Sequence, residues 1–267
     1  MIPTDPVPPA RRRWGQHFLK DAASAQRLVR AFGLGSDDRV VEIGPGNGAL
    51  TVPLARRVGR LVALEIDPAR LPALDERLAG CPGAEARLAD ATGVDWKALA
   101  DELGPPIRVV GNLPYNVGTV VVRRLLAAQG VRDAQVVLQK EVVDRILSGP
   151  GTRSYGPLSV IAALRGDRRG LVDLSPGSFR PAPKVWSKAV RLSLDPGAAL
   201  APGEVAWLEG WLFAGFRHRR KTLARNLAEY RMAVLAALAE AGLPEDARAE
   251  ALPPGVWLEL ARRLDAG

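Results

Sequence analysis

The chain has 267 residues, of which 47% are hydrophobic and 25% charged, so it can bury a sizeable core and is not a disordered polypeptide. Its one cysteine, Cys81, excludes an intrachain disulfide and suits a reducing cytoplasm. The formal net charge of +8 favours an anionic partner, nucleic acid first, with a merely basic soluble enzyme as the equal alternative.

The beginning of the chain has no apolar core of the kind that signal peptides contain. No apolar run reaches the ~18 residues that a membrane span needs. We therefore expect a cytoplasmic protein with no membrane partner. Residues 1–14 are rich in proline and are expected to be flexible.

Residues 20–35 are predicted to form a helix with Asp21 as its N-cap. Beyond it, apolar runs that indicate strands alternate with segments of helical composition. The strands are expected at 39–44, 61–66, 84–90, 107–112 and 134–139, and helices at 49–57, 68–79 and 117–128. This alternation predicts an α/β, Rossmann-like domain with a largely parallel sheet. Residues 171–174 and 188–194 are expected to add a closing antiparallel pair.

A linker is indicated by the sequence DPGAALAPGE at 195–204, after which the pattern becomes helical. Trp257, Leu260, Ala261 and Leu264 recur at the spacing of one helix face and follow a Pro-Pro pair. We therefore expect two domains, residues 1–195 forming the α/β domain and 196–267 a small all-helical C-terminal domain.

A glycine-rich loop follows the first predicted strand, in the sequence VVEIGPGNGALT. Gly44, Gly46 and Gly48 would let the backbone approach a ligand closely at the carboxyl end of the sheet. Glu65 ends the next strand, where a carboxylate can accept hydrogen bonds from a ribose. The pattern fits NAD, FAD or S-adenosylmethionine, and a structural glycine turn is the alternative without a ligand. The G-x-G-x-G spacing and the acidic Glu42 favour the cationic, phosphate-free S-adenosylmethionine.

The segment VVGNLPYNV, residues 109–117, follows the fourth predicted strand. Pro114 restricts the backbone of its neighbour, which makes the tetrapeptide from Asn112 to Tyr115 stiff and extended. Its carbonyl oxygens and the Asn112 side chain can accept from an exocyclic amine of a nucleobase, while Tyr115 stacks on the base. The alternative is an X-Pro turn with a core tyrosine.

The chain resembles the ribosomal RNA adenine N6-dimethyltransferases, the KsgA family of small-subunit enzymes. The matching motifs run in order over nearly the whole length. They are GQHFLKD (15–21), VVEIGPGNGALT (40–51), LEID (64–67), ADAT (89–92), VVGNLPYNV (109–117), LQKEVVDRI (138–146), YGPLSV (155–160), FRPAPKVWSKAVRL (179–192) and RRKTLARNL (219–227). The resemblance implies S-adenosylmethionine as the donor and the dimethylation of two neighbouring adenines near the 3′ end of 16S small-subunit rRNA, as a contribution to biogenesis of the 30S subunit.

The resemblance also implies a role for each residue that matches a family motif. His17, in place of the family's usual asparagine, and Leu19 would flank the methionine part of the cofactor, near Gly44 and Gly46. Glu65 would hold the ribose, while Asp90 and Ala91 would contact the adenine. Asn112 and Tyr115 would meet the target base, and Phe179 would cover its other face. Phe179 as a loop anchor in an apolar cluster is the alternative.

Residues 216–231 carry six Lys or Arg side chains and one Glu, interleaved with Phe216, Leu223 and Leu227. One face of this segment can pack while the other meets RNA phosphates. The candidate RNA-binding residues are Arg217, Arg219, Arg220, Lys221 and Arg225. A solvated charged face is the alternative. No metal site is expected, and the chain is expected to act on a 30S precursor as a monomer.

Three other functions compete with the small-subunit enzyme. One is a related enzyme that methylates large-subunit rRNA, which the RRKT stretch and the segment 179–192 disfavour. Another is a non-catalytic nucleic-acid-binding protein on the same scaffold, which the intact Asn112–Tyr115 motif and Glu65 disfavour. The last is an NAD-dependent oxidoreductase, which the spacing of the glycine loop disfavours.

Overall fold

The structure is a computed structural model that describes residues 17–266, so the expected flexibility of residues 1–14 lies outside the described residues. The chain divides into two compact units. Unit 1 comprises the chain up to Val143 together with Arg169–Ser193, and unit 2 comprises Asp144–Arg168 together with Leu194–Gly267. Each unit is described by itself.

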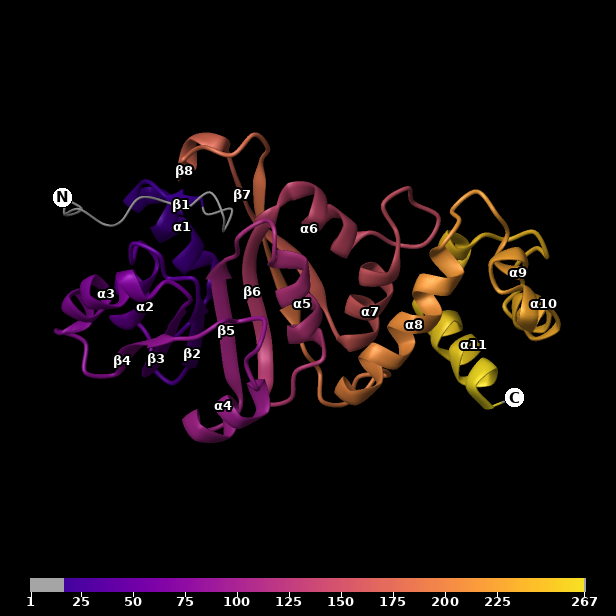
Figure 1. Cartoon of the computed structure of the whole chain (residues 1–267), viewed down its shortest axis with the longest axis horizontal. Coiled ribbons are helices and arrows are strands. Elements are labelled where there is room, and N and C mark those ends of the chain that lie inside the picture. The colour runs from indigo at the N-terminus through magenta and orange to yellow at the C-terminus, as the bar shows by residue number, and fades with distance from the viewer. Residues whose placement is uncertain (1–16, 267) are drawn as a thin grey trace. The chain divides into compact units, whose positions relative to one another are not determined.

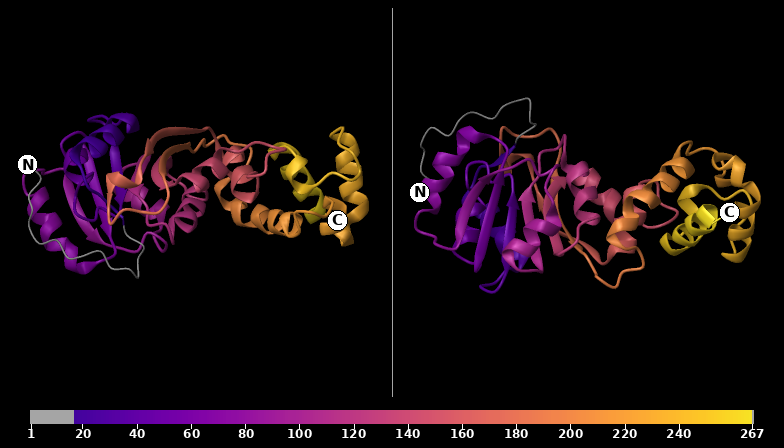
Figure 2. Two further views of the ribbon diagram at one scale, coloured as in Figure 1. Left: turned by 90° about the horizontal axis from the view of Figure 1, so that it is seen from above. Right: turned by 60° about the horizontal axis from the view of Figure 1, so that its bottom comes forward.

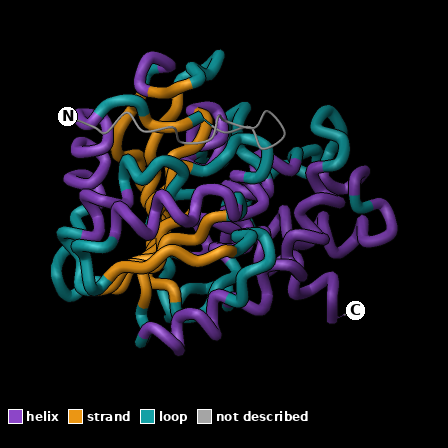
Figure 3. Tube along the Cα trace, turned by 60° about the vertical axis from the view of Figure 1, so that its left-hand side comes forward, coloured by secondary structure: helices purple, strands orange, loops and turns teal. Residues whose placement is uncertain are grey.

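Unit 1 is built on a seven-stranded sheet with the strand order β4-β3-β2-β5-β6-β9-β7. Figure 1 labels all of these strands except β9, and Figure 3 draws the strands in orange. Its strands are β2 (Arg39–Ile43), β3 (Arg60–Glu65), β4 (Ala84–Leu88), β5 (Ile107–Asn112), β6 (Val131–Gln139), β7 (Arg168–Leu174) and β9 (Ser187–Ser193). The neighbours from β4 to β6 pair in parallel, and β9 pairs antiparallel with β6. The expected Rossmann-like α/β class is confirmed.

The order of the strands fixes where a ligand can bind. The chain runs outward from β2 through β3 to β4 and then returns to the other side of β2 as β5. Ligands of such sheets bind at this switch point, outside the carboxyl ends of the strands. The loops after β2, β3 and β5 are therefore the parts of unit 1 that can form a site.

Helices flank this sheet on both sides (Figure 2). They are α1 (Ala22–Phe32), α2 (Thr51–Ala55), η2 (Pro68–Arg70), α3 (Leu71–Leu78), α4 (Trp96–Leu103), α5 (Gly118–Leu126) and α6 (Lys140–Leu147), the last of which continues into unit 2. Asp21 caps α1 as expected, since its carboxylate accepts from Ser24 N at 2.7 Å. The helix ends at Gly33, whose φ of 59° suits a left-handed C-cap.

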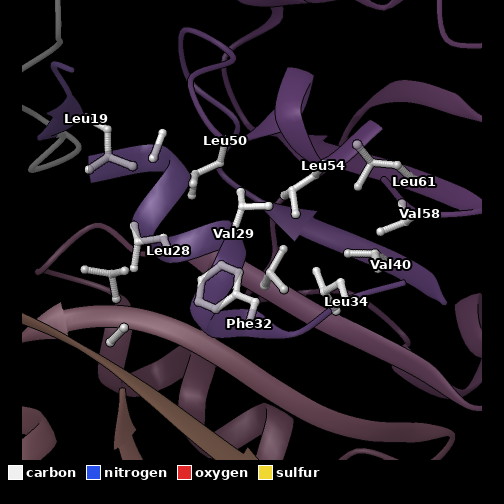
Figure 4. Packing of buried hydrophobic residues seen from close by; sticks show 14 of the residues in the cluster. Leu19, Leu28, Val29, Phe32, Leu34, Val40, Leu50, Leu54, Val58 and Leu61 are labelled. Atoms are coloured by element: carbon white, nitrogen blue, oxygen red, sulfur yellow. The ribbon is translucent and has the colours of Figure 1, made fainter. Parts of the chain in front are cut away.

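The core of unit 1 lies between α1, α2 and the sheet (Figure 4). Leu28, Val29 and Phe32 form the apolar face of α1 and are buried against strand residues such as Val40 and Leu61. A two-stranded antiparallel sheet joins this core, formed by β1 (Phe18–Leu19) and β8 (Phe179–Arg180), with η3 (Pro176–Ser178) before β8. The pairing of β1 and β8 brings the start of the described chain to the glycine-rich loop.

Unit 2 is formed mainly by helices, which pack around Trp257. They are α7 (Pro157–Arg165), η4 (Pro202–Glu204), α8 (Val205–Phe216), α9 (Leu223–Asn226), η5 (Ala228–Tyr230), α10 (Arg231–Glu240), η6 (Ala249–Ala251) and α11 (Pro254–Ala266). Trp257 is fully buried, stacks on Phe216 at 5.4 Å between ring centroids, and donates from Nε1 to Ala249 O at 3.1 Å. Gly215 makes room for the indole, because a Cβ there would lie 2.3 Å from the Trp257 ring.

The expected face of α11 is buried as predicted, from Trp257 to Leu264. The sequence placed residues 144–168 in the first domain, whereas in the structure they form one compact unit with residues 194–267. The Tyr155 hydroxyl donates to Leu252 O at 2.9 Å, and Arg165 donates to Leu200 O at 2.6 Å. None of the helices within residues 17–266 combines the length and the apolar character that crossing a membrane requires.

Candidate active site

A small pocket lies at the switch point of the sheet, where β2, β3 and β5 end. It is lined by His17, Phe18, Gly44, Gly46, Glu65, Asn112 and Pro114. The structure therefore brings together five residues that the sequence assigned to one site, from three strand ends and the segment before β1. The pocket encloses only about 30 Å³.

The glycine-rich loop needs glycine for two physical reasons. Gly44 and Gly46 have φ angles of 68° and 57°, which side-chain-bearing residues rarely adopt. Gly46 also lies against the Phe18 ring, where a Cβ would come within 2.6 Å of ring carbons. The Arg70 guanidinium lies over the same ring, 4.5 Å from its centroid. Phe18 thus occupies the space over the loop, and sequence reasoning gave this residue no role.

Glu65 ends β3 beneath the glycine loop and is 1% exposed. Its carboxylate accepts from Gly46 N at 3.1 Å and from the backbone N–H groups of Ile66 and Asp67, both at 3.0 Å. Three bonds leave acceptor capacity on a carboxylate, which has about four lone-pair sites. The side chain is therefore held in one orientation and lines the pocket.

Glu42 of β2 is the second acidic residue at this end of the sheet, and it is 1% exposed. Burial raises the pKa of Glu42 to about 8, the Thr51 hydroxyl opposes this shift, and the nearby Glu65 charge adds to it. The free energy cost of ionising this buried carboxyl would fall if a cation were placed nearby.

Asp90 and Ala91 follow β4 at the same edge of the sheet, two strands away from β2. Asp90 is exposed, and its Oδ1 accepts from Thr92 N at 2.8 Å and from the Thr92 hydroxyl at 2.7 Å. Neither residue lines the small pocket. An adenine contact at Asp90 would extend the site outward along the strand ends.

Asn112 ends β5 and joins the motif after it to the segment before β1. Its Nδ2 donates to His17 O at 2.7 Å, which orients the amide. Within residues 17–266 no protein hydrogen bond forms at its Oδ1. Pro114 O accepts from Gly118 N at 2.8 Å, so the motif turns directly into α5. The side-chain oxygen therefore remains able to accept a hydrogen bond. It is the atom that sequence analysis predicts to accept from a base amine.

Tyr115 lies beside His17, with ring centroids 5.1 Å apart and ring planes tilted by 39°. Its hydroxyl is 2.5 Å from the Ser187 Oγ of β9. Burial raises the pKa of Tyr115, while the Ser187 hydrogen bond lowers it. The His17 Nδ1–H donates to Pro181 O at 2.7 Å, because a carbonyl can only accept. Sequence reasoning missed Ser187 and Pro181, although both belong to the quoted segment 179–192.

Leu19 and Phe179 lie in the core rather than in the pocket. They are register partners in the β1–β8 pair and are 4% and 3% exposed. Both belong to the hydrophobic cluster around α1. Such burial is what the loop-anchor alternative predicts for Phe179. Stacking on a base would require the Phe179 ring to leave this cluster.

The five candidate RNA-binding cations of unit 2 are all exposed, while Leu223 and Leu227 are buried. Arg219 donates to Arg153 O at 2.6 Å and lies 3.8 Å from a Glu250 carboxylate oxygen. Residues 216–231 therefore bury one apolar face in unit 2 and expose their charged side chains to solvent. Within the described chain, no three His, Cys, Asp or Glu side chains gather as metal ligands would.

The pocket chemistry suits a cationic nucleoside cofactor. Its lining includes a carboxylate, an amide and glycine backbone, and among residues 17–266 no Lys or Arg lines it. A nucleoside is much larger than 30 Å³, so one held at Glu65 would extend beyond this pocket. The fold and the pocket together define an α/β protein of the class that binds a nucleoside-containing cofactor at the switch point.

Comparison with known proteins places the chain within this class. The family model for ribosomal RNA adenine dimethylase matches residues 8–266, and the chain belongs to this family. It is 41% identical to the Ribosomal RNA small subunit methyltransferase A of Bordetella bronchiseptica over 263 residues, covering 96% of this chain and 94% of the relative. The protein of the same name from Xanthomonas campestris pv. campestris is 39% identical over 254 residues, with 95% of both chains covered.

Two solved structures share the fold over nearly the whole chain. A dimethyladenosine transferase from Plasmodium falciparum superposes with a TM-score of 0.79 at 22% identity, covering 94% of this chain and 98% of that one. The 23S rRNA methyltransferase ErmE superposes with a TM-score of 0.72 at 28% identity, covering 93% and 99%. The family model and the relatives at about 40% identity confirm the expected methyltransferase family.

Proposed function

We propose that the chain transfers methyl groups from S-adenosylmethionine to N6 of two neighbouring adenines near the 3′ end of small-subunit rRNA. The observation that carries this proposal is the hydrogen bond from Asn112 Nδ2 to His17 O beside the Glu65 pocket. This bond orients the Asn112 side-chain oxygen at the edge of the proposed cofactor site, where the Tyr115 ring also lies beside His17. The small-subunit relatives at about 40% identity support this choice of RNA over the large-subunit ErmE at 28%.

The residues that would hold the cofactor form one connected arrangement. Glu65 would accept from the ribose, with Gly44 and Gly46 beside it and Asp90 and Ala91 toward the adenine. When bound, S-adenosylmethionine supplies an electrophilic methyl on a cationic sulfonium. Within residues 17–266 no Lys or Arg lines the pocket, so the described lining would not repel that charge. The backbone oxygen of His17 accepts from Asn112, and its ring contacts the Tyr115 ring.

Asn112 and Tyr115 would prepare the target amine. The lone pair of an aromatic amine is delocalised into its ring, which makes the nitrogen a poor nucleophile. Asn112 Oδ1 and a neighbouring backbone carbonyl would accept from its N–H groups and favour a pyramidal nitrogen in the transition state. Stacking on Tyr115 is worth about 1–3 kcal/mol. The alkylated nitrogen is acidic and loses its proton readily, so these residues need not include a strong base.

The RNA partner is proposed to be the 30S subunit or its precursor, with methylation contributing to subunit biogenesis in the cytoplasm by a monomeric enzyme. The exposed cations of unit 2, Arg217, Arg219, Arg220, Lys221 and Arg225, support binding to phosphates. Arg219 is the least free of these, since it already donates to Arg153 O.

The substrate assignment is tested by offering radiolabelled S-adenosylmethionine with undermethylated small subunits or with large subunits. We expect label in small-subunit rRNA and background label in the large subunit. Label confined to the large subunit would establish the ErmE-like alternative. RNA binding without methylation of either subunit would establish a binding protein on a methyltransferase scaffold.

A further inference from the structure

A second and larger cavity of unit 1 shares the glycine-rich loop with the candidate active site. It encloses about 460 Å³. Its walls come from the end of β1, the first turns of α1, residues 47–49 of the loop, α2 and one side chain of α3. Among the described lining residues, Leu19 and Gly48 are those that the sequence placed at the ligand site, and none of the residues whose backbone N–H groups donate to Glu65 lines the cavity.

The charged side chains that line this cavity in the described part of the chain all have one sign. Lys20, Arg56 and Arg77 line it, and no Asp or Glu among residues 17–266 does. Lys20 and Arg56 are exposed, and within residues 17–266 neither side chain forms an ion pair. Arg77 is half-buried and donates from Nη1 to Asn47 O, which fixes its guanidinium at the wall of the cavity. Gly48 lies beside this side chain, and its φ of 78° is one that side-chain-bearing residues rarely adopt.

The rest of the lining is mostly apolar, with Ala25 from α1 and Val52 and Pro53 from α2. An apolar surface next to three cations suits a molecule that has both a flat or carbon-rich part and a negative charge. A nucleotide unit of RNA has this combination, with its base and ribose beside a phosphate. A cationic sulfonium would be repelled by the same three side chains.

We propose that this cavity seats one unpaired nucleotide of the substrate RNA, with the adjoining phosphates contacting Lys20 and Arg56. The proposal rests on the proposed function, because the RNA is the anion that function supplies. Arg77, already held by Asn47, forms the fixed part of the phosphate contact. Neither Lys20 nor Arg56 has a side-chain partner among residues 17–266, so contacts with phosphate would break no bond described in that part of the chain.

The test uses the full chain with both exposed cations neutralised, K20Q/R56Q. The matched control is R39Q/R132Q, which makes the same charge change near the amino ends of β2 and β6, at the opposite edge of the sheet. Both arginines of the control are exposed. Binding to undermethylated small subunits is measured over a range of salt concentrations, and binding of S-adenosylmethionine is measured by calorimetry.

We expect K20Q/R56Q to weaken RNA binding about threefold to tenfold relative to the control, as charge-assisted surface contacts do. The slope of log K against log salt should fall by about 0.7–0.9 for each lost phosphate contact. Affinity for S-adenosylmethionine should stay within twofold of wild type. A slope equal to that of the control would overturn the proposal. Weakened cofactor binding with unchanged RNA binding would also overturn it and assign the cavity to the cofactor's carboxylate.

A cross-linking experiment locates the nucleotide. Gln26 is an exposed residue of the cavity wall, and Cys81 is the chain's one cysteine. Gln26→Cys in a Cys81→Ser background therefore carries a photoactivatable group at one position, with Arg132→Cys as the control. We expect a cross-link to one short rRNA segment from position 26 and none from position 132. Equal cross-linking from both positions would overturn the proposal, and wild-type protein that does not bind small subunits would overturn the proposed function as well.

Discussion

The hydroxyl of Tyr115 lies 2.5 Å from the Oγ of Ser187, which is fully buried at the start of β9. The two residues belong to segments 72 positions apart, and the antiparallel pairing of β9 with β6 fixes Ser187 opposite Gln139. The ring proposed to stack on the target base is thus oriented by β9, which lies two strands away from β5 in the sheet. Its orientation does not depend on the Asn112–Tyr115 motif alone.

This bond gives the first prediction. Tyr115→Phe and Ser187→Ala should each lower kcat by a few fold, because a hydrogen bond of this kind contributes about 0.5–1.5 kcal/mol. The double variant should be no slower than the worse single variant, since both substitutions remove one interaction. Tyr115→Ala should also weaken RNA binding through lost stacking. Single-turnover rates and RNA affinities check this, and independent, additive losses would show that Ser187 does not act through Tyr115.

The second prediction concerns Asn112, whose oxygen is proposed to act on the transition state. Asn112→Ala should lower the single-turnover rate by roughly 10²-fold, as removal of other preorganised groups does, with little change in RNA affinity. Asn112→Asp should not restore the rate, because it cannot donate to His17 O and adds a negative charge beside a sulfonium. A wild-type rate for Asn112→Ala at saturating cofactor and RNA would make the motif a structural turn.

The third prediction concerns Glu65. Glu65→Gln keeps the size of the side chain, and its amide oxygen can still accept from Gly46 N. Because the variant weakens the charge-assisted bonds to a ribose, its affinity for S-adenosylmethionine should fall by about tenfold or more. Glu65→Ala should reduce this affinity further, because it also removes the bond from Gly46 N that holds the glycine loop. RNA affinity should change little. Calorimetry that finds wild-type cofactor affinity in both variants would remove Glu65 from the cofactor site.

The fourth prediction concerns pH and stability. The pKa of Glu42 is raised from 4.5 to about 8 in the folded chain. Between these pH values the folded state therefore binds more protons than the unfolded state. Relative to Glu42→Gln, the wild type should therefore lose stability as the pH rises from 4.5 to about 8, by about 1.4 kcal/mol per pH unit. Urea unfolding of both proteins across this range measures the difference, and a constant difference would show that Glu42 ionises normally.

Features that depend on local sequence were predictable. Apolar runs located the strands, Asp21 was recognised as an N-cap from its place before an apolar periodic segment, and the glycines after β2 indicated a loop with unusual φ angles. The pocket residues Glu65 and Asn112 followed from the rule that parallel strands end at one edge of a sheet.

Features that depend on pairing between distant segments were not predictable from local patterns. β6 begins at Val131, before the predicted residue 134, because Val131 pairs with Ile107 of β5, and the buried Asp133 forms an ion pair with Arg108 at 2.8 Å. Phe18 lies over the glycine loop because β1 pairs with β8, some 160 residues later in the chain. The same pairing buries Phe179, which composition alone could not distinguish from an exposed stacking ring.

The central claim is that the chain dimethylates two neighbouring adenines of small-subunit rRNA, and nucleoside analysis of the reaction product tests it most directly. Undermethylated small subunits are incubated to completion with S-adenosylmethionine, and the rRNA is digested and analysed by mass spectrometry. The account predicts N6,N6-dimethyladenosine from two adjacent positions near the 3′ end, absent when Asn112→Ala protein is used for the same time. Wild-type protein that leaves these adenines unmodified would contradict it.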